Sequence, residues 1–374
     1  MPRLGARSMW LCAALCLALA AADASGQAMV FPGDDWQEAP PASQRVDPQK
    51  LDAAMEYLAE AFKDTGGIRE TVVIRNGRMI WQGEDIDRRH SIWSASKSYA
   101  STVLGLLIDD GKCTLDTPAK DIIPELAERY PTVTLRHFAT MTSGYDAEGG
   151  GYGKSDPLDG SKTPFDPTTP LFAPGARFGY WDDAMRQFGN ILTQIAGEPL
   201  EATFKRRIAD PISMDPAQWR WRSRGTVKGL LVNDAAGGID TTARELARFG
   251  HLFLNRGNWS GRQLVSAAWV DQATAVHVPA TIPHNAISDR QKRIDGRGVY
   301  GLNWWVNGIK PDGTRKWPAA TARTYAASGF NENKCFVIPE WGMVVVRMGT
   351  EGRPDNIDEV WSTFFGKLRE ALGK

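Results

Sequence analysis

The segments that predict β-structure lie at the two ends of the chain, separated by a long middle region. Near the N-terminus, residues 71–83 form two β-rich runs joined by Asn76-Gly77, the strongest short hairpin signal. Further strands with short turns are predicted near the C-terminus, at residues 300–308, 324–330, 334–340 and 342–350. Short turns between strands favour an antiparallel sheet, so the two ends of the chain are expected to share one sheet.

Helices are predicted beside these strands and throughout the middle region. Residues 47–67 read as a helix with Asp47 as its N-cap, and residues 357–374 form an amphipathic pattern. The fold class is therefore α+β, an antiparallel sheet flanked by helices plus a mainly helical insert. The expected parts are a discontinuous α/β part, at about 40–93 and 290–374, and a helical part at about 94–289. The polar stretch 146–164 is expected to be a surface loop.

Composition excludes some partners. The chain has 374 residues, 42% of them hydrophobic, which is enough for a sizeable core. Its 44 basic and 44 acidic residues cancel, so charge gives no reason to expect nucleic acid or an anionic membrane surface as a partner. We expect a small-molecule partner and no stable membrane partner.

The N-terminus resembles a secretory signal peptide over residues 1–24. Arg3 and Arg7 precede the apolar run 9–22, and Ala22-Asp23-Ala24 forms an A-x-A cleavage site. We expect cleavage after Ala24 and a periplasmic or secreted mature chain, residues 25–374. Two cysteines then remain, Cys113 and Cys335, either as a disulfide or as two separate apolar side chains.

The chemical signal is Ser94-Ala95-Ser96-Lys97, at the start of an apolar helix predicted to run to Gly111. A lysine near a helix N-terminus opposes the helix dipole, so its position needs a reason. Ser94 and Lys97 lie one turn apart on the same helix face. Burial favours the neutral amine, which can accept a proton from Ser94 Oγ as that oxygen attacks a carbonyl.

Several segments in one order carry a family resemblance. These are residues 91–126, which include the Ser-x-x-Lys motif, and residues 133–145, 172–200 and 235–270. From about Val46 to its C-terminus the chain resembles the serine β-lactamase and penicillin-binding-protein superfamily. The resemblance is to its class C-like branch, which includes esterases, D-amino-acid peptidases and 6-aminohexanoate-oligomer hydrolases. It implies a β-lactamase/transpeptidase-like fold and an acyl-serine intermediate, with no metal and no cofactor.

The resemblance also implies roles for individual residues. Ser94 is the nucleophile, Lys97 its base or proton relay, and Tyr180 the second-motif tyrosine that passes a proton to the leaving group. The third motif aligns with Ala327-Ser328-Gly329. The backbone N–H groups of Ser94 and Phe330 are then expected to form the oxyanion hole.

Two motif positions depart from the family pattern. Asp182 stands where the family has asparagine, and it either orients Lys97 and the substrate or turns away. Ala327 stands where β-lactamases have a lysine that helps bind the β-lactam carboxylate, and alanine cannot bind one. Arg323 is a possible substitute cation. The remaining candidates for substrate binding are Trp181, Ser328 and Gly329.

The sequence therefore favours an exported hydrolase of a small ester or amide. Two alternatives stay open: a β-lactamase or D-amino-acid peptidase, and a catalytically inactive relative that binds a ligand or partner. Gly153-Lys154-Ser155 lacks the strand and first glycine of a phosphate-binding loop, and the histidines lack metal-ligand spacing. Of Trp304 and Trp305, which are neighbours in a predicted strand, at most one should face a cleft.

Overall fold

The two ends of the chain share one seven-stranded sheet. The computed structural model describes residues 27–149, 163–287 and 289–373. The strand order is β1 (Gln37–Glu38), β3 (Arg78–Gln82), β2 (Thr71–Arg75), β14 (Met343–Arg347), β13 (Asn333–Ile338), β12 (Tyr325–Gly329) and β11 (Trp305–Val306). Each neighbouring pair is antiparallel except β1 with β3. The predicted α+β class with a mainly antiparallel sheet is confirmed.

Local sequence signals explain the ends of several elements. Asn76 and Gly77 both have positive φ, 49° and 80°, which is the turn geometry that matches the twist of a two-strand hairpin. Helix α1 (Pro48–Ala61) begins after Asp47, whose side chain accepts a hydrogen bond from the backbone N–H of Lys50. The predicted hairpin and first helix are therefore present.

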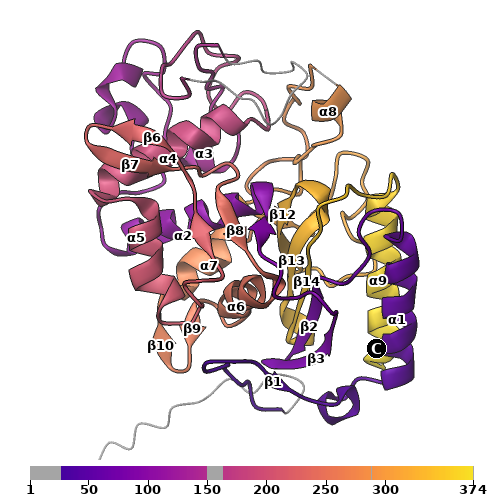
Figure 1. Ribbon diagram of the computed structural model, residues 1–374. Helices are drawn as coiled ribbons and strands as arrows, with labels where there is room; N and C mark the ends of the chain where they lie inside the picture. Colours follow the sequence, from indigo (N-terminus) through magenta and orange to yellow (C-terminus); the bar gives the residue numbers. More distant parts are fainter. Residues whose placement is uncertain (1–26, 150–162, 288, 374) are drawn as a thin grey trace, which may run out of the picture.

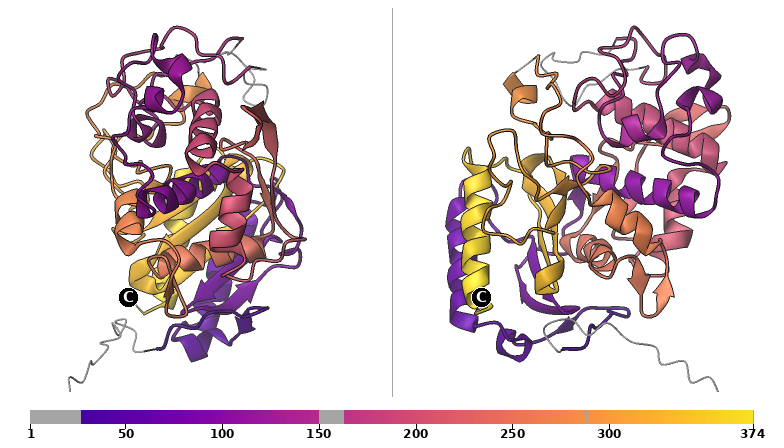
Figure 2. Two further views of the ribbon diagram at one scale, coloured as in Figure 1. Left: turned by 90° about the vertical axis from the view of Figure 1, so that its left-hand side faces the viewer. Right: turned by 180° about the vertical axis from the view of Figure 1, so that it is seen from behind.

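Helices cover both faces of the sheet. On one face α1 packs beside α9 (Ile357–Ala371), and the two enclose an apolar core with the sheet (Figure 2). On the other face α6 (Ala243–Leu254) lies against β2, β13 and β14. Figure 1 shows five of the remaining helices grouped beyond α6: α2 (Ser96–Asp109), α3 (Leu135–Ala139), α4 (Asp182–Ala196), α5 (Leu200–Phe204) and α7 (Ala267–Ala273). Helix α8 (Asp289–Lys292) lies apart from them, above β12 in that view.

A second apolar core lies on the α6 side of the sheet, and helix α2 runs through its centre. Every residue from Ser96 to Leu107 is buried, including the polar ones, so this helix is enclosed on all sides. A short 3-10 turn, Trp93–Ala95, precedes it and contains Ser94. The helix predicted from Ser94 to Gly111 thus begins two residues later and ends at Asp109.

Short strands outside the seven-stranded sheet form three small sheets. The strand pairs are β4 (His90–Ser91) and β5 (Arg220–Trp221) on either side of β8 (Ile239–Thr241), then β6 (Ser223–Val227) with β7 (Leu230–Asn233), and β9 (Asn258–Trp259) with β10 (Arg262–Gln263). The strand predicted over residues 300–308 is reduced to the two residues of β11.

Other sequence predictions have different outcomes. Cys113 and Cys335 are both free and buried, so they do not pair. The predicted signal peptide lies outside the described residues, as do Gly153-Lys154-Ser155 and most of the predicted loop 146–164. In the described part of the chain, no helix combines the length and apolar character that crossing a bilayer requires.

Two helical glycines allow a matched test of the packing of α6 on the sheet. A Cβ at Gly250 would lie 2.5 Å from Cys335 Sγ and 2.8 Å from Val344 Cγ1, whereas the nearest atom to one at Gly366, in α9, is at 3.8 Å. Alanine gains about 1 kcal/mol over glycine in a helix, but overpacking costs about 1–3 kcal/mol. We expect Gly250→Ala to lower the free energy of unfolding and Gly366→Ala to raise it, measured by urea denaturation. Equal changes in the two variants would contradict close packing of α6.

Candidate active site

Ser94 lies where the end of β12 meets the 3-10 turn. A Cβ at Gly329 would lie only 1.9 Å from the carbonyl oxygen of Ile92, so this contact has room only for glycine. Trp93 has a φ of 50°, which is uncommon for a bulky residue and is found where surrounding structure holds the backbone in place. The turn that presents Ser94 is therefore fixed by its contact with the sheet.

Lys97 is almost completely buried, with 1% of its surface exposed. Its Nζ donates to Ser94 Oγ at 2.9 Å, to Asp182 Oδ1 at 2.7 Å and to the Ala236 carbonyl oxygen at 2.8 Å. These three acceptors match the three N–H donors of an ammonium group. The Asp182 side chain therefore faces Lys97 and does not turn away from it.

Tyr180 lies on the chain just before α4 and close to the same lysine. Lys97 Nζ is 4.9 Å from the centroid of the Tyr180 ring, and that ring stacks on Trp305 with centroids 6.1 Å apart. Ser94 and Tyr180 line one cavity together. The three residues singled out in the sequence, Ser94, Lys97 and Tyr180, are thus brought together.

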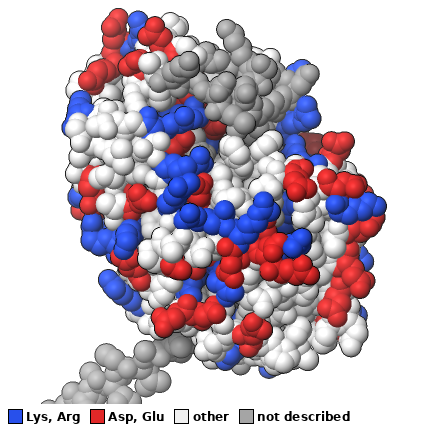
Figure 3. Space-filling view, in the orientation of Figure 1, with Lys and Arg blue, Asp and Glu red and all other residues white. Residues whose placement is uncertain are grey.

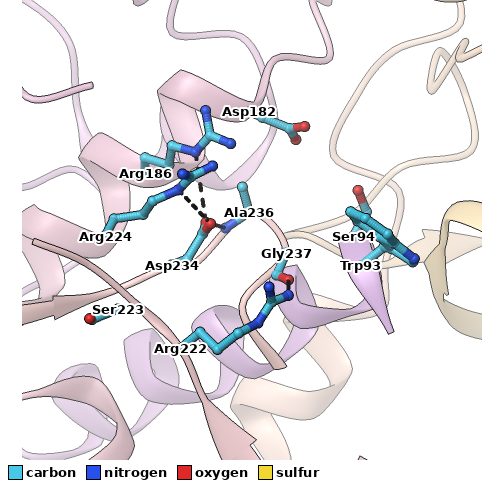
Figure 4. Close-up of a pocket in the computed structure, with 10 residues that line it drawn as sticks. All are labelled: Trp93, Ser94, Asp182, Arg186, Arg222, Ser223, Arg224, Asp234, Ala236 and Gly237. Atoms are coloured by element: carbon cyan, nitrogen blue, oxygen red, sulfur yellow. Dashed lines mark hydrogen bonds and ion pairs between the residues drawn. The ribbon is translucent and has the colours of Figure 1, made fainter. Parts of the chain in front are cut away.

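Ser94 opens onto two cavities. The larger, of about 810 Å³, lies between the end of β12 and the start of α9, and it includes Tyr180, Trp305, Ser328, Gly329 and Phe330 in its walls. The smaller, of about 330 Å³, lies on the other side of Ser94 (Figure 4). Its walls are Trp93, Ser94, Asp182, Arg186, Arg222, Ser223, Arg224, Asp234, Ala236 and Gly237.

The third motif supplies the wall of the larger cavity but no cation of its own. Ala327 is fully buried in the core, while Ser328 faces the cavity. Lys334, which pairs with Ser328 across β12 and β13, donates to Ser328 Oγ at 2.6 Å. Lys316 also lines this cavity, with its Nζ 4.7 Å from the centroid of Trp305, and burial lowers the pKa of its amine. The sequence analysis missed both lysines, although Lys334 could have been found from the register of the 325–338 hairpin.

Two proposed substrate contacts do not line either cavity. The Arg323 side chain is 73% exposed and donates from Nε to Glu340 Oε1 at 3.2 Å. Trp181 is buried and its indole N–H donates to Asp146 Oδ1 at 3.2 Å. Of the two neighbouring tryptophans, Trp305 lines the larger cavity and Trp304 is buried in the core. Arg323 is therefore not the substitute cation, and Trp181 is a packing residue.

No metal centre accompanies the site in the part of the chain that the structure describes, because no three His, Cys, Asp or Glu side chains there are grouped to hold an ion. His90, which lies in β4, contacts the Glu70 carboxylate and the Ser91 carbonyl oxygen. Ser94 Oγ thus contacts the Lys97 amine, which in turn contacts the Asp182 carboxylate and lies over the Tyr180 ring.

The fold and this site define a class: an α+β protein with a serine and a buried lysine one turn apart, packed against an antiparallel sheet. Comparison with known families agrees, because the family model named Beta-lactamase matches residues 58–361. The chain therefore belongs to the beta-lactamase family, a family of serine hydrolases related to the penicillin-binding proteins.

Individual relatives are distant. The chain is 24% identical over 183 residues to a beta-lactamase of Pseudomonas fluorescens, covering 44% of this chain and 49% of that protein. It is 25% identical over 248 residues to a 6-aminohexanoate-dimer hydrolase of Paenarthrobacter ureafaciens, covering 59% of each. The chain thus spans about half the length of the curated relatives it matches. A penicillin-binding-protein homologue of Caulobacter crescentus has a similar structure, with a TM-score of 0.63, 18% identity, and 87% and 98% of the two chains covered.

The buried Lys97–Asp182 pair predicts a double-mutant effect on stability. Lys97→Met leaves the Asp182 carboxylate without its ammonium partner, so we expect the free energy of unfolding to fall by about 3 kcal/mol. Lys97→Met with Asp182→Asn removes both charges and should regain most of that loss. Urea denaturation of the two single variants and the double variant measures the coupling.

Lys316→Met is the matched control. Lys316 pairs with Asp358, whose side chain is exposed and stays solvated without its partner, so the loss should be below about 1 kcal/mol. Additive effects of the Lys97 and Asp182 substitutions would contradict a charged pair.

Proposed function

We propose that this chain is an exported serine hydrolase that cleaves an ester or amide bond of a small molecule through an acyl intermediate on Ser94. One observation carries the proposal: buried Lys97 donates to Ser94 Oγ at 2.9 Å beside a cavity that Tyr180 shares. Membership of the beta-lactamase family supports acyl-serine chemistry. The signal-like residues 1–24 support export.

The proton of Ser94 needs an acceptor before its oxygen can attack. Lys97 makes three donor contacts, so it must first release a proton, and the Asp182 carboxylate at 2.7 Å is in position to take it. Neutral Lys97 then accepts the Ser94 proton as the Oγ–carbon bond forms. Lys97 and Asp182 thus act as one proton-holding unit, in which the carboxylate replaces the family's asparagine.

The remaining steps use the walls of the larger cavity. The backbone N–H groups of Ser94 and Phe330 are proposed to donate to the carbonyl oxygen as it gains negative charge. Tyr180 donates a proton to the leaving oxygen or nitrogen as its bond to carbon breaks. Water then attacks the acyl–Ser94 ester, its proton returns to the same groups, and Ser94 regains its hydroxyl hydrogen.

A β-lactamase or D-amino-acid peptidase activity remains the second candidate, and one contact favours it. Lys334 brings a cation to Ser328, beside the position where Ala327 replaces the family lysine. A carboxylate in the larger cavity could pair with this ammonium. Glu332 Oε2 lies 3.2 Å from Lys334 Nζ and balances its charge in part, since Glu332 is also shared with Arg353 at 3.6 Å. We favour a neutral ester or amide leaving group because Ala327 itself supplies no cation.

Substitution of Ser94 tests the acyl-enzyme directly. We expect wild type to react with a fluorophosphonate probe and to hydrolyse 4-nitrophenyl butyrate, and Ser94→Ala to lose both by at least about a thousandfold because the nucleophile is absent. Ser96→Ala is the control, since Ser96 Oγ accepts from the Ile239 N–H and belongs to the helix rather than to a cavity wall. Intact mass spectrometry detects the adduct, and peptide mapping by tandem mass spectrometry assigns it to a residue.

Other results of these experiments would favour a different function. Equal labelling of Ser94→Ala and wild type would overturn the mechanism. Rapid nitrocefin hydrolysis, or a long-lived penicillin adduct on Ser94, would favour the β-lactamase or peptidase. Unreactive wild type that still binds a ligand would point to the inactive relative.

A further inference from the structure

The smaller cavity beside Ser94 is walled by three arginines. Arg186 comes from α4, Arg224 from β6, and Arg222 from the link between β5 and β6. Figure 4 shows the guanidinium groups of Arg186 and Arg224 beside Asp234, and Arg222 beside Gly237, with Ser94 and Asp182 across the cavity. Lys and Arg side chains also gather in a band across the middle of this face of the molecule (Figure 3). The proposed mechanism uses none of these arginines.

Local carboxylates do not cancel this charge. Asp183 pairs with Arg186 at 2.7 Å, Asp234 with Arg224 at 2.9 Å, and Asp240 is shared by Arg220 and Arg222 at 2.7 Å and 3.2 Å. Asp240 is thus shared with Arg220, which lies outside the cavity, so these carboxylates balance the three cavity arginines only in part. Asp182 also lines the cavity; it pairs with Lys97, and its charge acts on Arg186 as well.

The arginines keep donors for a ligand. Each guanidinium has five N–H donors, more than these contacts use. The Nε of Arg186 is buried near Asp234 Oδ1, at 3.9 Å, so the donors that a ligand can reach belong mainly to Arg222 and Arg224. Arg222 and Arg224 have side chains 45% and 35% exposed, so an entering group can reach them. The cavity thus offers a partly buried, cationic, hydrogen-bond-donating wall, which suits a planar carboxylate.

The two cavities receive different halves of a substrate, and this step rests on the proposed function. Tyr180, which protonates the leaving group, lies on the wall of the larger cavity, so the leaving group enters there. The acyl group on the other side of the scissile bond then extends past Ser94 into the smaller cavity. We propose that the arginines bind a carboxylate at the far end of the acyl chain. The substrates are then half-esters or half-amides of dicarboxylic acids.

Three esters of equal chain length test the charge preference. The 4-methylumbelliferyl esters of adipic acid (one carboxyl free), hexanoic acid and 6-aminohexanoic acid differ only in an anionic, neutral or cationic end. We expect kcat/KM to be about ten- to a hundredfold higher for the adipate than for the hexanoate, the value of a charge-assisted hydrogen bond to a partly buried group. The 6-aminohexanoate ester should be the slowest, because its ammonium meets the arginines.

Variants locate the preference. Arg224→Gln and, independently, Arg222→Gln should each lower the adipate-to-hexanoate ratio of kcat/KM by about tenfold. Arg220→Gln is the matched control: it also contacts Asp240 but does not line the cavity, so the ratio should not change. A substitution that disturbs folding or the groups around Ser94 lowers kcat/KM for both esters alike, so the adipate-to-hexanoate ratio does not change for that reason.

The outcomes separate the two proposals. Ser94-dependent hydrolysis of all three esters at similar rates, or faster hydrolysis of the 6-aminohexanoate ester, overturns the carboxylate subsite and leaves the hydrolase intact. If the preference for adipate is unchanged in both Arg224→Gln and Arg222→Gln, the carboxylate does not bind in the smaller cavity, and the proposed subsite is wrong. Failure of every ester together with no fluorophosphonate label on Ser94 overturns the hydrolase and, with it, the subsite.

Discussion

Burial of the Lys97 amine is the constraint on which the architecture around the site depends. An ammonium removed from water needs a compensating charge and hydrogen-bond acceptors, and here they come from three separate parts of the chain. Ser94 is three residues away, Asp182 is 85 and Ala236 is 139. Helix α4 must therefore begin beside α2, and the segment after β7 must turn its carbonyl group inward. The lysine proposed as the proton acceptor therefore also joins the helices around it.

A second close contact joins this helical arrangement to the sheet. Gly329 ends β12 against the Ile92 carbonyl, and Ile92 in turn donates its N–H to Ile239 in β8. The turn that holds Ser94 is thus clamped between the large sheet and the small one. Because Phe330 follows Gly329 directly, the same contact sets the position of the backbone N–H proposed for the oxyanion hole. A single glycine contact therefore fixes the position of Ser94, the proposed nucleophile, relative to β12 and β8.

The sequence predicted the features that depend on neighbouring residues. The Asn76-Gly77 hairpin, the Asp47 cap and the serine–lysine spacing all follow from local geometry, and the structure has each of them. Side-chain direction depends on distant partners and was harder to predict. Arg323 turns to Glu340 and Trp181 to Asp146, contacts that no local pattern indicated. The arginine-walled cavity forms only when α4 approaches β6, so the sequence analysis gave no sign of it.

Charge is distributed differently at the reacting centre and beyond it. Next to Ser94 the ammonium of Lys97 is matched by one carboxylate, which lets a proton move within the pair without creating net charge. In the smaller cavity the three arginines are only partly balanced by carboxylates, because Asp240 is shared with Arg220, so the proposed anionic end of the acyl chain would meet a positive field there. Because the smaller cavity opens directly onto Ser94, an anion bound there in the proposed mode would also orient the carbonyl for attack. In that proposal selectivity and positioning come from the same contact, so a change in the cavity wall would alter the preferred acyl chain without a change at Ser94, Lys97 or Tyr180.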